Sequence, residues 1–173
     1  LRVAKLLRIK LPYLKTVLQQ HSDMFVVHYV RDPRAIAQSR LFGQVDETKW
    51  ILRAKSLCRE MNLDYQAAEE LKSLYPGMLL TLRYEDLVRK PATYQKILYG
   101  HFDKEPTLRT QHWIRNVLNA TVSDERPFTL HRKNVASRMH VWKNLYSDDA
   151  IRTVTSDPQC QTVLQGLGYL DEE

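Results

Sequence analysis

The sequence predicts an α/β fold in which two parallel strands are joined by a long helix. An apolar run from Met24 to Arg31 has the composition of a strand, and Met78 to Leu82 has the same character. Between them, Glu47 to Tyr75 keeps apolar side chains at helical spacing until Pro76-Gly77 ends the pattern. A strand, a long helical crossover and a second strand form a parallel βαβ unit.

The rest of the chain predicts helices and little else. The further segments are a basic helix over Leu1 to Gln20 interrupted by Pro12, a helix from Asp32 to about Phe42, a helix after the second strand, a loop near Pro106, a helix through Trp113 and Val117, an irregular stretch from Ser123 to Ser137 and short helices in the last third. The chain is therefore expected to be helix-rich.

Length and composition indicate one globular domain over residues 1–173. The sequence is 43% hydrophobic and 27% charged, which is ordinary usage for such a domain. A formal charge of +6 favours anionic ligands, and on charge alone a nucleotide, an acidic glycan and nucleic acid fit equally well. No apolar run approaches the ~20 residues of a membrane span, and the beginning of the sequence is no secretory signal.

The end of the first predicted strand carries residues suited to bind a phosphate. Arg31 ends the strand, Asp32 is the expected N-cap of the next helix, and Ser39 falls about two turns into that helix. Ligands of open α/β sheets bind at the carboxyl ends of the strands. A guanidinium, a hydroxyl and a helix N-terminus at one point suit a phosphate dianion, and Arg34 and Arg40 are expected to add positive charge nearby.

The segment Val30-Arg31-Asp32-Pro33-Arg34, followed by Ser39-Arg40, resembles the 3′-phosphate-binding motif of sulfotransferases that use 3′-phosphoadenosine 5′-phosphosulfate (PAPS). It is most similar to the Golgi carbohydrate sulfotransferases of the galactose/N-acetylglucosamine/N-acetylgalactosamine 6-O type. In that family the arginine and the serine eight residues later bind the 3′-phosphate. The resemblance implies this role for Arg31 and Ser39. Taken alone, the segment is equally a strand-turn-helix junction with solvated arginines.

A second segment, Leu82-Arg83-Tyr84-Glu85-Asp86-Leu87, resembles the Arg-Tyr-Glu-Asp-Leu run that the family carries at the end of another strand. The resemblance implies that Tyr84 lies near the adenine of the cofactor. A purely structural interpretation is that Tyr84 packs over the end of the strand. Glu85 and Asp86 are expected to be structural, pairing with nearby arginines or capping the following helix.

A third segment, from Arg132-Lys133-Asn134 through Ser137-Arg138 to Trp142-Lys143-Asn144, is similar to the late family segment that closes over the cofactor. Many cytosolic sulfotransferases have a glycine where Asn134 stands here. The resemblance makes Arg132 and Ser137 candidate phosphate contacts. The ending from Cys160 to Gly166-Leu167-Gly168-Tyr169 also resembles the carbohydrate branch.

The resemblance implies a parallel-sheet, P-loop-like sulfotransferase fold of which this chain is the C-terminal portion. The five glycines do not form the N-terminal loop that holds the 5′-phosphosulfate in the family, so that loop and its strand are expected upstream, together with the membrane anchor of a type II protein of the Golgi lumen. No catalytic base can be named. His28 alternates with Val26 and Val30 on one strand face, which is typical of a core histidine.

The activity that the resemblance implies is transfer of a sulfuryl group from PAPS to a glycan or glycosaminoglycan hydroxyl, expected to be a 6-OH. No metal and no nucleic-acid partner are implied, and neither the sugar nor the oligomeric state is defined. Two other classes stay open: a non-catalytic protein that keeps the nucleotide 3′-phosphate site, and a basic helical module for nucleic acid.

The two cysteines, Cys58 and Cys160, lack the spacing of a zinc site. Each is expected to be a small buried side chain, or the two form a disulfide if the protein is lumenal. The tripeptide Asn119-Ala120-Thr121 is a glycosylation sequon and is compatible with a secretory compartment.

Overall fold

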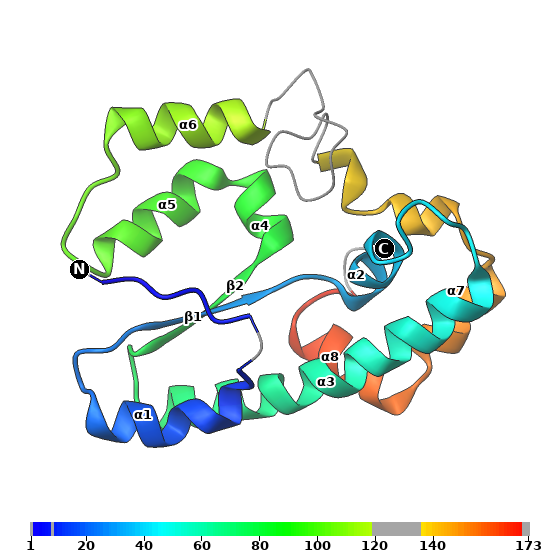
Figure 1. The fold of residues 1–173 in the computed structure, drawn as a ribbon, viewed down its shortest axis with the longest axis horizontal. Helices are drawn as coiled ribbons and strands as arrows, with labels where there is room; N and C mark the ends of the chain where they lie inside the picture. Colours follow the sequence, from blue (N-terminus) through cyan, green and yellow to red (C-terminus); the bar gives the residue numbers. More distant parts are fainter. Residues whose placement is uncertain (1, 8, 119–135, 171–173) are drawn as a thin grey trace. The chain divides into compact units, whose positions relative to one another are not determined.

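The computed structural model describes residues 2–7, 9–118 and 136–170 (Figure 1). Its contacts divide the chain into two compact units. The first unit combines Leu1–Thr81 with Tyr146–Glu173, and the second is Leu82–Leu145. The first unit therefore brings the two ends of the chain into one body.

The first unit consists of a strand pair and helices drawn from both ends of the chain. Its elements are η1 (Leu11–Tyr13), α1 (Leu14–Gln20), β1 (Val26–Val30), α2 (Pro33–Ser39), α3 (Glu47–Leu74), the beginning of β2 (Leu79–Arg83), α7 (Asp148–Thr155) and α8 (Pro158–Gly166). The second unit is helical beyond the end of β2, with α4 (Tyr84–Arg89), α5 (Pro91–Gly100), α6 (Leu108–Leu118), η2 (Ala136–Arg138) and η3 (Val141–Asn144).

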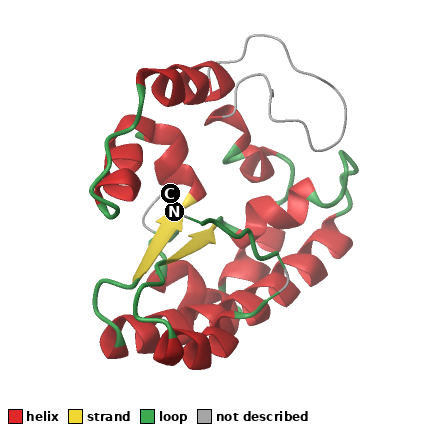
Figure 2. Ribbon diagram, turned by 60° about the vertical axis from the view of Figure 1, so that its left-hand side comes forward, coloured by secondary structure: helices red, strands yellow, loops and turns green. Residues whose placement is uncertain are grey.

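β1 and β2 are neighbours in a small parallel sheet, which has two strands in the part of the chain that the structure describes (Figure 2). The N–H of Val26 donates to the carbonyl of Met78 at 2.8 Å. The long helix α3 connects the two strands, as a parallel pair requires. The structure thus confirms the predicted helix-rich α/β class and its βαβ unit.

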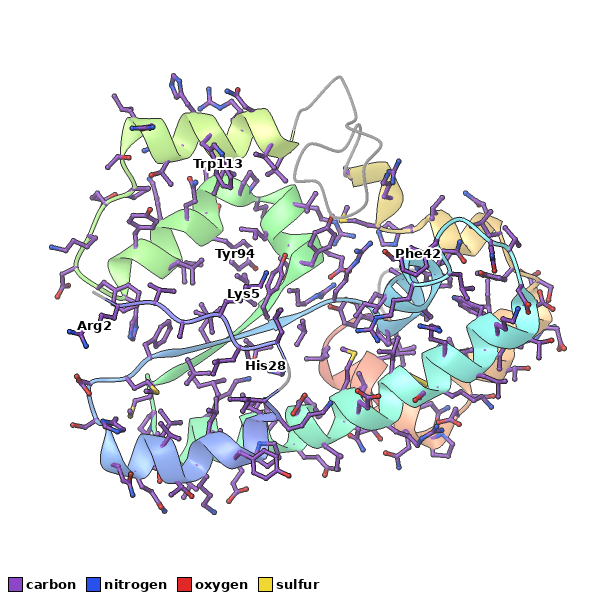
Figure 3. The ribbon with its side chains drawn as sticks, viewed as in Figure 1. Arg2, Lys5, His28, Phe42, Tyr94 and Trp113 are labelled. Atoms are coloured by element: carbon purple, nitrogen blue, oxygen red, sulfur yellow. A yellow bond between two sulfur atoms is a disulfide. The ribbon has the colours of Figure 1, made fainter. Side chains whose placement is uncertain are left out.

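One face of β1 is covered and the other is open. Val30 is buried and Val26 and His28 are half-buried, whereas Val27 and Tyr29 are 41% and 53% exposed. His28, labelled in Figure 3, therefore lies on the covered face, as its alternation predicts. Burial lowers the pKa of His28, a carboxylate at Asp64 opposes this shift, and the charge of Lys72 adds to it.

α3 is the main packing element of the first unit. Asp46 caps it by accepting a hydrogen bond from the N–H of Lys49 at 2.9 Å. One side of the helix packs against α2, α7, α8 and η1, and α8 runs beside it in Figure 1. The buried residues of this side are Trp50, Ala54, Leu57, Cys58, Asn62, Ala67, Ala68 and Leu71. Helical periodicity therefore predicted both the helix and its core face.

A disulfide joins α3 to α8. Cys58 and Cys160 are bonded, with a Cα–Cα distance of 4.8 Å and a sequence separation of 102. The same helix pair is packed closely at Gly166, where an added Cβ would lie 2.4 Å from Cζ of Tyr65. Of the two alternatives that the sequence left open for the cysteines, the structure shows the disulfide. A residue without a side chain at position 166 leaves room for the ring of Tyr65.

The second unit is built around α4 and α5, and α5 packs on α6. Glu85 is fully buried, and Asp86 lies 3.6 Å from the Nε of Arg83 in an ion pair. The ion pair confirms that Asp86 pairs with a nearby arginine. No residue of α6 is buried, and Trp113 on this helix is 50% exposed (Figure 3).

Three predicted boundaries are wrong for local reasons. The described residues before Leu11 are not helical, because Pro12 stands in the first turn of η1, where proline begins a helix instead of interrupting one. Two helices, α4 and α5, replace one after β2, because Pro91 disfavours helical conformation at Lys90. α2 ends at Ser39 and not at about Phe42, which has a φ of 51°. Most of the stretch predicted irregular lies outside the described residues.

Candidate functional site

Arg31 lies where the sequence predicts it, immediately after the last residue of β1 and before α2. Its side chain is half-buried. The next residue, Asp32, caps α2 by accepting a hydrogen bond from the N–H of Arg34 at 2.8 Å, and Pro33 occupies the first turn. Local sequence signals therefore fix the turn that brings Arg31 to the carboxyl end of the strand.

Ser39 is the last residue of α2 and is exposed. At a rise of 1.5 Å per residue, it lies about 9 Å along the helix axis from Pro33. Arg31 and Ser39 therefore flank α2 at its two ends. One phosphate can contact both residues only if the long side chain of Arg31 extends along this short helix toward Ser39.

Arg34 corrects one expectation about charge. Its guanidinium is 2% exposed and lies against the carboxylate of Asp32, with Nε–Oδ1 and Nη2–Oδ2 distances of 3.1 and 3.0 Å. Nη2 also donates to the carbonyl of Tyr169 at 3.0 Å. The charge of Arg34 is neutralised inside the core, so the prediction that it adds positive charge to the phosphate site is wrong. Arg40, in contrast, is exposed.

A layer of aromatic and amide groups holds α2 in place. The indole N–H of Trp50 donates to the carbonyl of Arg34 at 3.1 Å, and its ring stacks on Tyr146 with centroids 4.2 Å apart. The hydroxyl of Tyr146 donates to Oε1 of Gln38. Burial raises the pKa of this hydroxyl, which makes its ionisation still less favourable than that of an exposed tyrosine. Sequence reasoning missed Tyr146, because no local signal connects it to Gln38, 108 positions earlier.

The second unit carries the other candidate contacts. Tyr84 is the first residue of α4 and is half-buried, and α4 packs on η2, the short helix that contains Ser137. Nη2 of Arg89 lies 3.2 Å from Nε2 of His140 in the same region. The structure thus brings the segments of Tyr84 and Ser137 together within this unit, while Arg132 lies outside the described residues.

Among the residues that the structure describes, no group of three or more His, Cys, Asp or Glu side chains is arranged to hold a metal ion. In the same residues, no helix is both long enough and apolar enough to cross a membrane.

Most of the sequence is similar to sulfotransferases that act on carbohydrates. Human (Homo sapiens) carbohydrate sulfotransferase 2 is 22% identical over 187 residues, which cover 85% of this chain and 35% of that protein. Carbohydrate sulfotransferase 4 of Mus musculus is 26% identical over 166 residues, covering 86% of this chain and 42% of that protein. Human carbohydrate sulfotransferase 6 is 28% identical over 167 residues, with coverages of 85% and 42%.

The similarity to several such enzymes, over the same large share of the sequence, supports a place for this chain among sulfotransferases that act on carbohydrates. The chain spans between 35% and 42% of the length of the three relatives named above. No family model matches the sequence, and no solved structure matches it.

Proposed function

We propose that this chain supplies the 3′-phosphate-binding part of an enzyme that transfers a sulfuryl group from PAPS to a glycan hydroxyl, with a 6-OH as the acceptor. The observation that carries the proposal is the position of Arg31 at the carboxyl end of a parallel strand, directly before the capped helix α2. The similarity to carbohydrate sulfotransferases supports the same proposal, because this strand-helix junction is the place where open α/β sheets bind ligands.

The donor set at this junction suits a phosphate group. A guanidinium offers paired N–H donors to phosphate oxygens, and a serine hydroxyl adds a further donor. PAPS, when bound, supplies the sulfuryl group and the leaving 5′-phosphate. Arg31 and Ser39 act on the other end of the nucleotide, where they raise affinity and align the donor for in-line attack. Tyr84, Arg132 and Ser137 are proposed as further cofactor contacts, and no residue is assigned as the catalytic base.

We further propose that both units belong to one domain with a P-loop-like sulfotransferase fold. The parallel βαβ unit of β1, α3 and β2 supports this proposal, because parallel strands joined by helical crossovers are what such a fold is built from. The proposed compartment is the Golgi lumen, as in type II membrane enzymes. The disulfide between Cys58 and Cys160 supports an oxidising compartment, where such bonds form and persist.

The 3′-phosphate assignment is tested by comparing the affinities of two nucleotides. PAP, the desulfated cofactor, carries the 3′-phosphate, and adenosine 5′-monophosphate does not. We expect the Arg31→Ala variant to bind PAP about 2 to 4 kcal/mol more weakly, because a charge-assisted partner is lost, and Ser39→Ala to bind about 1 kcal/mol more weakly. Affinity for adenosine 5′-monophosphate should change little in either variant.

Arg59→Ala is the matched control, because Arg59 is an exposed arginine on α3 away from the junction. Calorimetric titration gives the affinities, and circular dichroism checks that each variant folds. Equal PAP affinity in the wild-type chain and in Arg31→Ala would refute the assignment. A sulfate-transfer assay of the protein with its expected upstream phosphosulfate loop, with labelled PAPS and galactose, N-acetylglucosamine and chondroitin acceptors, then separates an enzyme from a protein that only binds PAP.

A further inference from the structure

The first unit carries a basic groove that begins at Arg40, beside the proposed nucleotide site, and continues along α3. Its volume is about 470 Å³. It is lined by Arg40, which follows α2, and by residues at successive helical turns of α3, including Lys49, Leu52, Arg53, Ser56 and Glu60. The groove therefore lies within one unit and is formed by the end of α2 and the first four turns of α3.

The charges in the groove are unequally neutralised. Lys49 pairs with Asp46 at 3.0 Å, and the acid of the groove, Glu60, pairs with Lys10 at 3.1 Å. Arg40 and Arg53 are both exposed, and neither side chain has an ion pair or a hydrogen bond with any residue that the structure describes. Two guanidinium groups with unused donors therefore face the same hollow.

Apolar groups accompany these two arginines. Leu52, which lines the groove, is 65% exposed. Phe42 is 78% exposed and is labelled beside α2 in Figure 3. Because it follows Arg40 by two residues, its Cα lies within about 7 Å of the Cα of Arg40. The left-handed turn that holds Phe42 (φ 51°) is completed by Gly43 (φ 87°). Exposed apolar surface beside unused guanidinium groups suits a ligand with both C–H faces and oxyanions.

We propose that this groove binds the sulfate or carboxylate substituents of an acidic glycan. The inference rests on the proposed function, since the glycan would be the acceptor of the enzyme or a stretch of the same polymer. The guanidinium groups of Arg40 and Arg53 hold the oxyanions, because their planar donor sets match sulfate and carboxylate. Leu52 and Phe42 contact the apolar faces of the sugar rings.

The sparse charge of the groove favours a glycan over nucleic acid. Duplex DNA carries a negative charge every ~1.7 Å along its axis, and proteins that bind it neutralise several phosphates at once. Here only two cations are unpaired, and a carboxylate at Glu60 lines the same groove. A polymer with one oxyanion per sugar or disaccharide matches two unpaired cations better than a continuous phosphate backbone does.

The test measures binding of a chondroitin sulfate hexasaccharide and of duplex DNA to the full chain. The Arg40→Ala/Arg53→Ala variant should bind the hexasaccharide at least about tenfold more weakly, which corresponds to about 1.4 kcal/mol. Arg59→Ala/Arg152→Ala is the matched control, because it removes the same charge from exposed positions outside the groove. The control should lose no more than about twofold, and a chemically desulfated, carboxyl-reduced hexasaccharide should bind poorly to every form.

Three results would overturn the inference: no hexasaccharide binding by the wild-type chain at millimolar concentration, equal losses of hexasaccharide affinity in the two double variants, or tighter DNA binding that only the groove variant loses.

PAP titrations distinguish a failure of the groove proposal from a failure of the nucleotide proposal. Arg53→Ala should bind PAP like the wild-type chain. If Arg31→Ala also binds PAP normally while the groove variant loses the glycan, the nucleotide assignment fails and the groove assignment stands.

Discussion

The two ends of α2 belong to one sequence motif but have opposite environments. At the N-terminal end, Asp32 and Arg34 are 3% and 2% exposed and form a bidentate ion pair that also binds the carbonyl of Tyr169. At the C-terminal end, Ser39 and Arg40 are exposed. The comparison shows that an arginine-rich motif divides its arginines between structure and binding, and that burial decides which arginine does which.

The buried end of α2 is constrained by the free-energy cost of burying a charge. A guanidinium removed from water is tolerated only where a carboxylate and further acceptors satisfy its donors, and removing one partner leaves an uncompensated charge in the core. The exposed end has no such constraint, so its donors remain available to a ligand. Substitutions at the two ends should therefore differ sharply in their effects on stability.

The largest effect is expected for Asp32→Ala. This change removes the N-cap of α2 and leaves the charge of Arg34 buried without its carboxylate, so the free energy of unfolding should fall by about 3 to 5 kcal/mol. Urea denaturation at pH 7 measures the loss. Ser39→Ala, at the other end of the same helix, is the matched control and should change stability by less than about 0.5 kcal/mol. Similar losses in the two variants would remove the contrast between the ends.

The buried end also depends on α8, because Tyr169 follows that helix and the disulfide fastens it to α3. Replacing both cysteines, Cys58→Ser/Cys160→Ser, should lower the free energy of unfolding by about 2 to 5 kcal/mol, since a loop of 102 residues is no longer closed in the unfolded chain. Denaturation of the variant is compared with that of the oxidised wild-type chain. A variant as stable as the wild type would mean that α8 is held on α3 by packing alone.

A smaller loss is expected where α8 meets α3 most closely. Gly166→Ala would place a Cβ 2.4 Å from the ring of Tyr65, and such overpacking costs about 1 to 3 kcal/mol. Gly100→Ala is the matched control, because an added Cβ there has no atom within 4 Å and alanine favours the helix. Thermal unfolding of both variants should show a lower midpoint for the first only. Equal midpoints would show that Tyr65 moves aside without cost.

The smallest effect concerns His28, on the strand that leads to Arg31. Burial lowers the pKa of His28 in the folded state below its ordinary value of 6.5. The unfolded chain therefore binds the proton more tightly, so the contribution to stability is present above about pH 6.5 and is lost as the pH falls toward the lowered pKa.

His28→Gln should reduce the difference in unfolding free energy between pH 7.5 and pH 5.5 relative to the wild-type chain. His112→Gln, on the exposed surface of α6, serves as the control and should leave that difference as it is in the wild type. If the two variants have the same pH dependence as the wild-type chain, His28 is solvated in both states and the covered face of β1 is more open than described.

Short-range signals in the sequence determined the strand-helix junction and the crossover. The apolar run before Arg31, the cap at Asp32 and the proline after it act over a few residues, so they can be read without the fold. The core face of α3 follows from its own periodicity. The sequence left open whether Cys58 and Cys160 are separate buried side chains or a disulfide, and the structure shows the disulfide. The position of Arg31 was predicted in this way, whereas its contact with a phosphate stays a prediction.

The roles of the side chains around Arg31 were determined by the tertiary structure alone. Arg34 was expected to serve the phosphate site, but its partner Tyr169 lies 135 residues away, and only folding brings that carbonyl to the guanidinium. The same holds for Tyr146 against Gln38 and for the groove between Arg40 and α3. A charged side chain can be either desolvated and paired or exposed and available to a ligand. The sequence shows that a residue is charged. The packing of distant segments around that residue determines its dielectric environment and its interaction partners, and therefore its role.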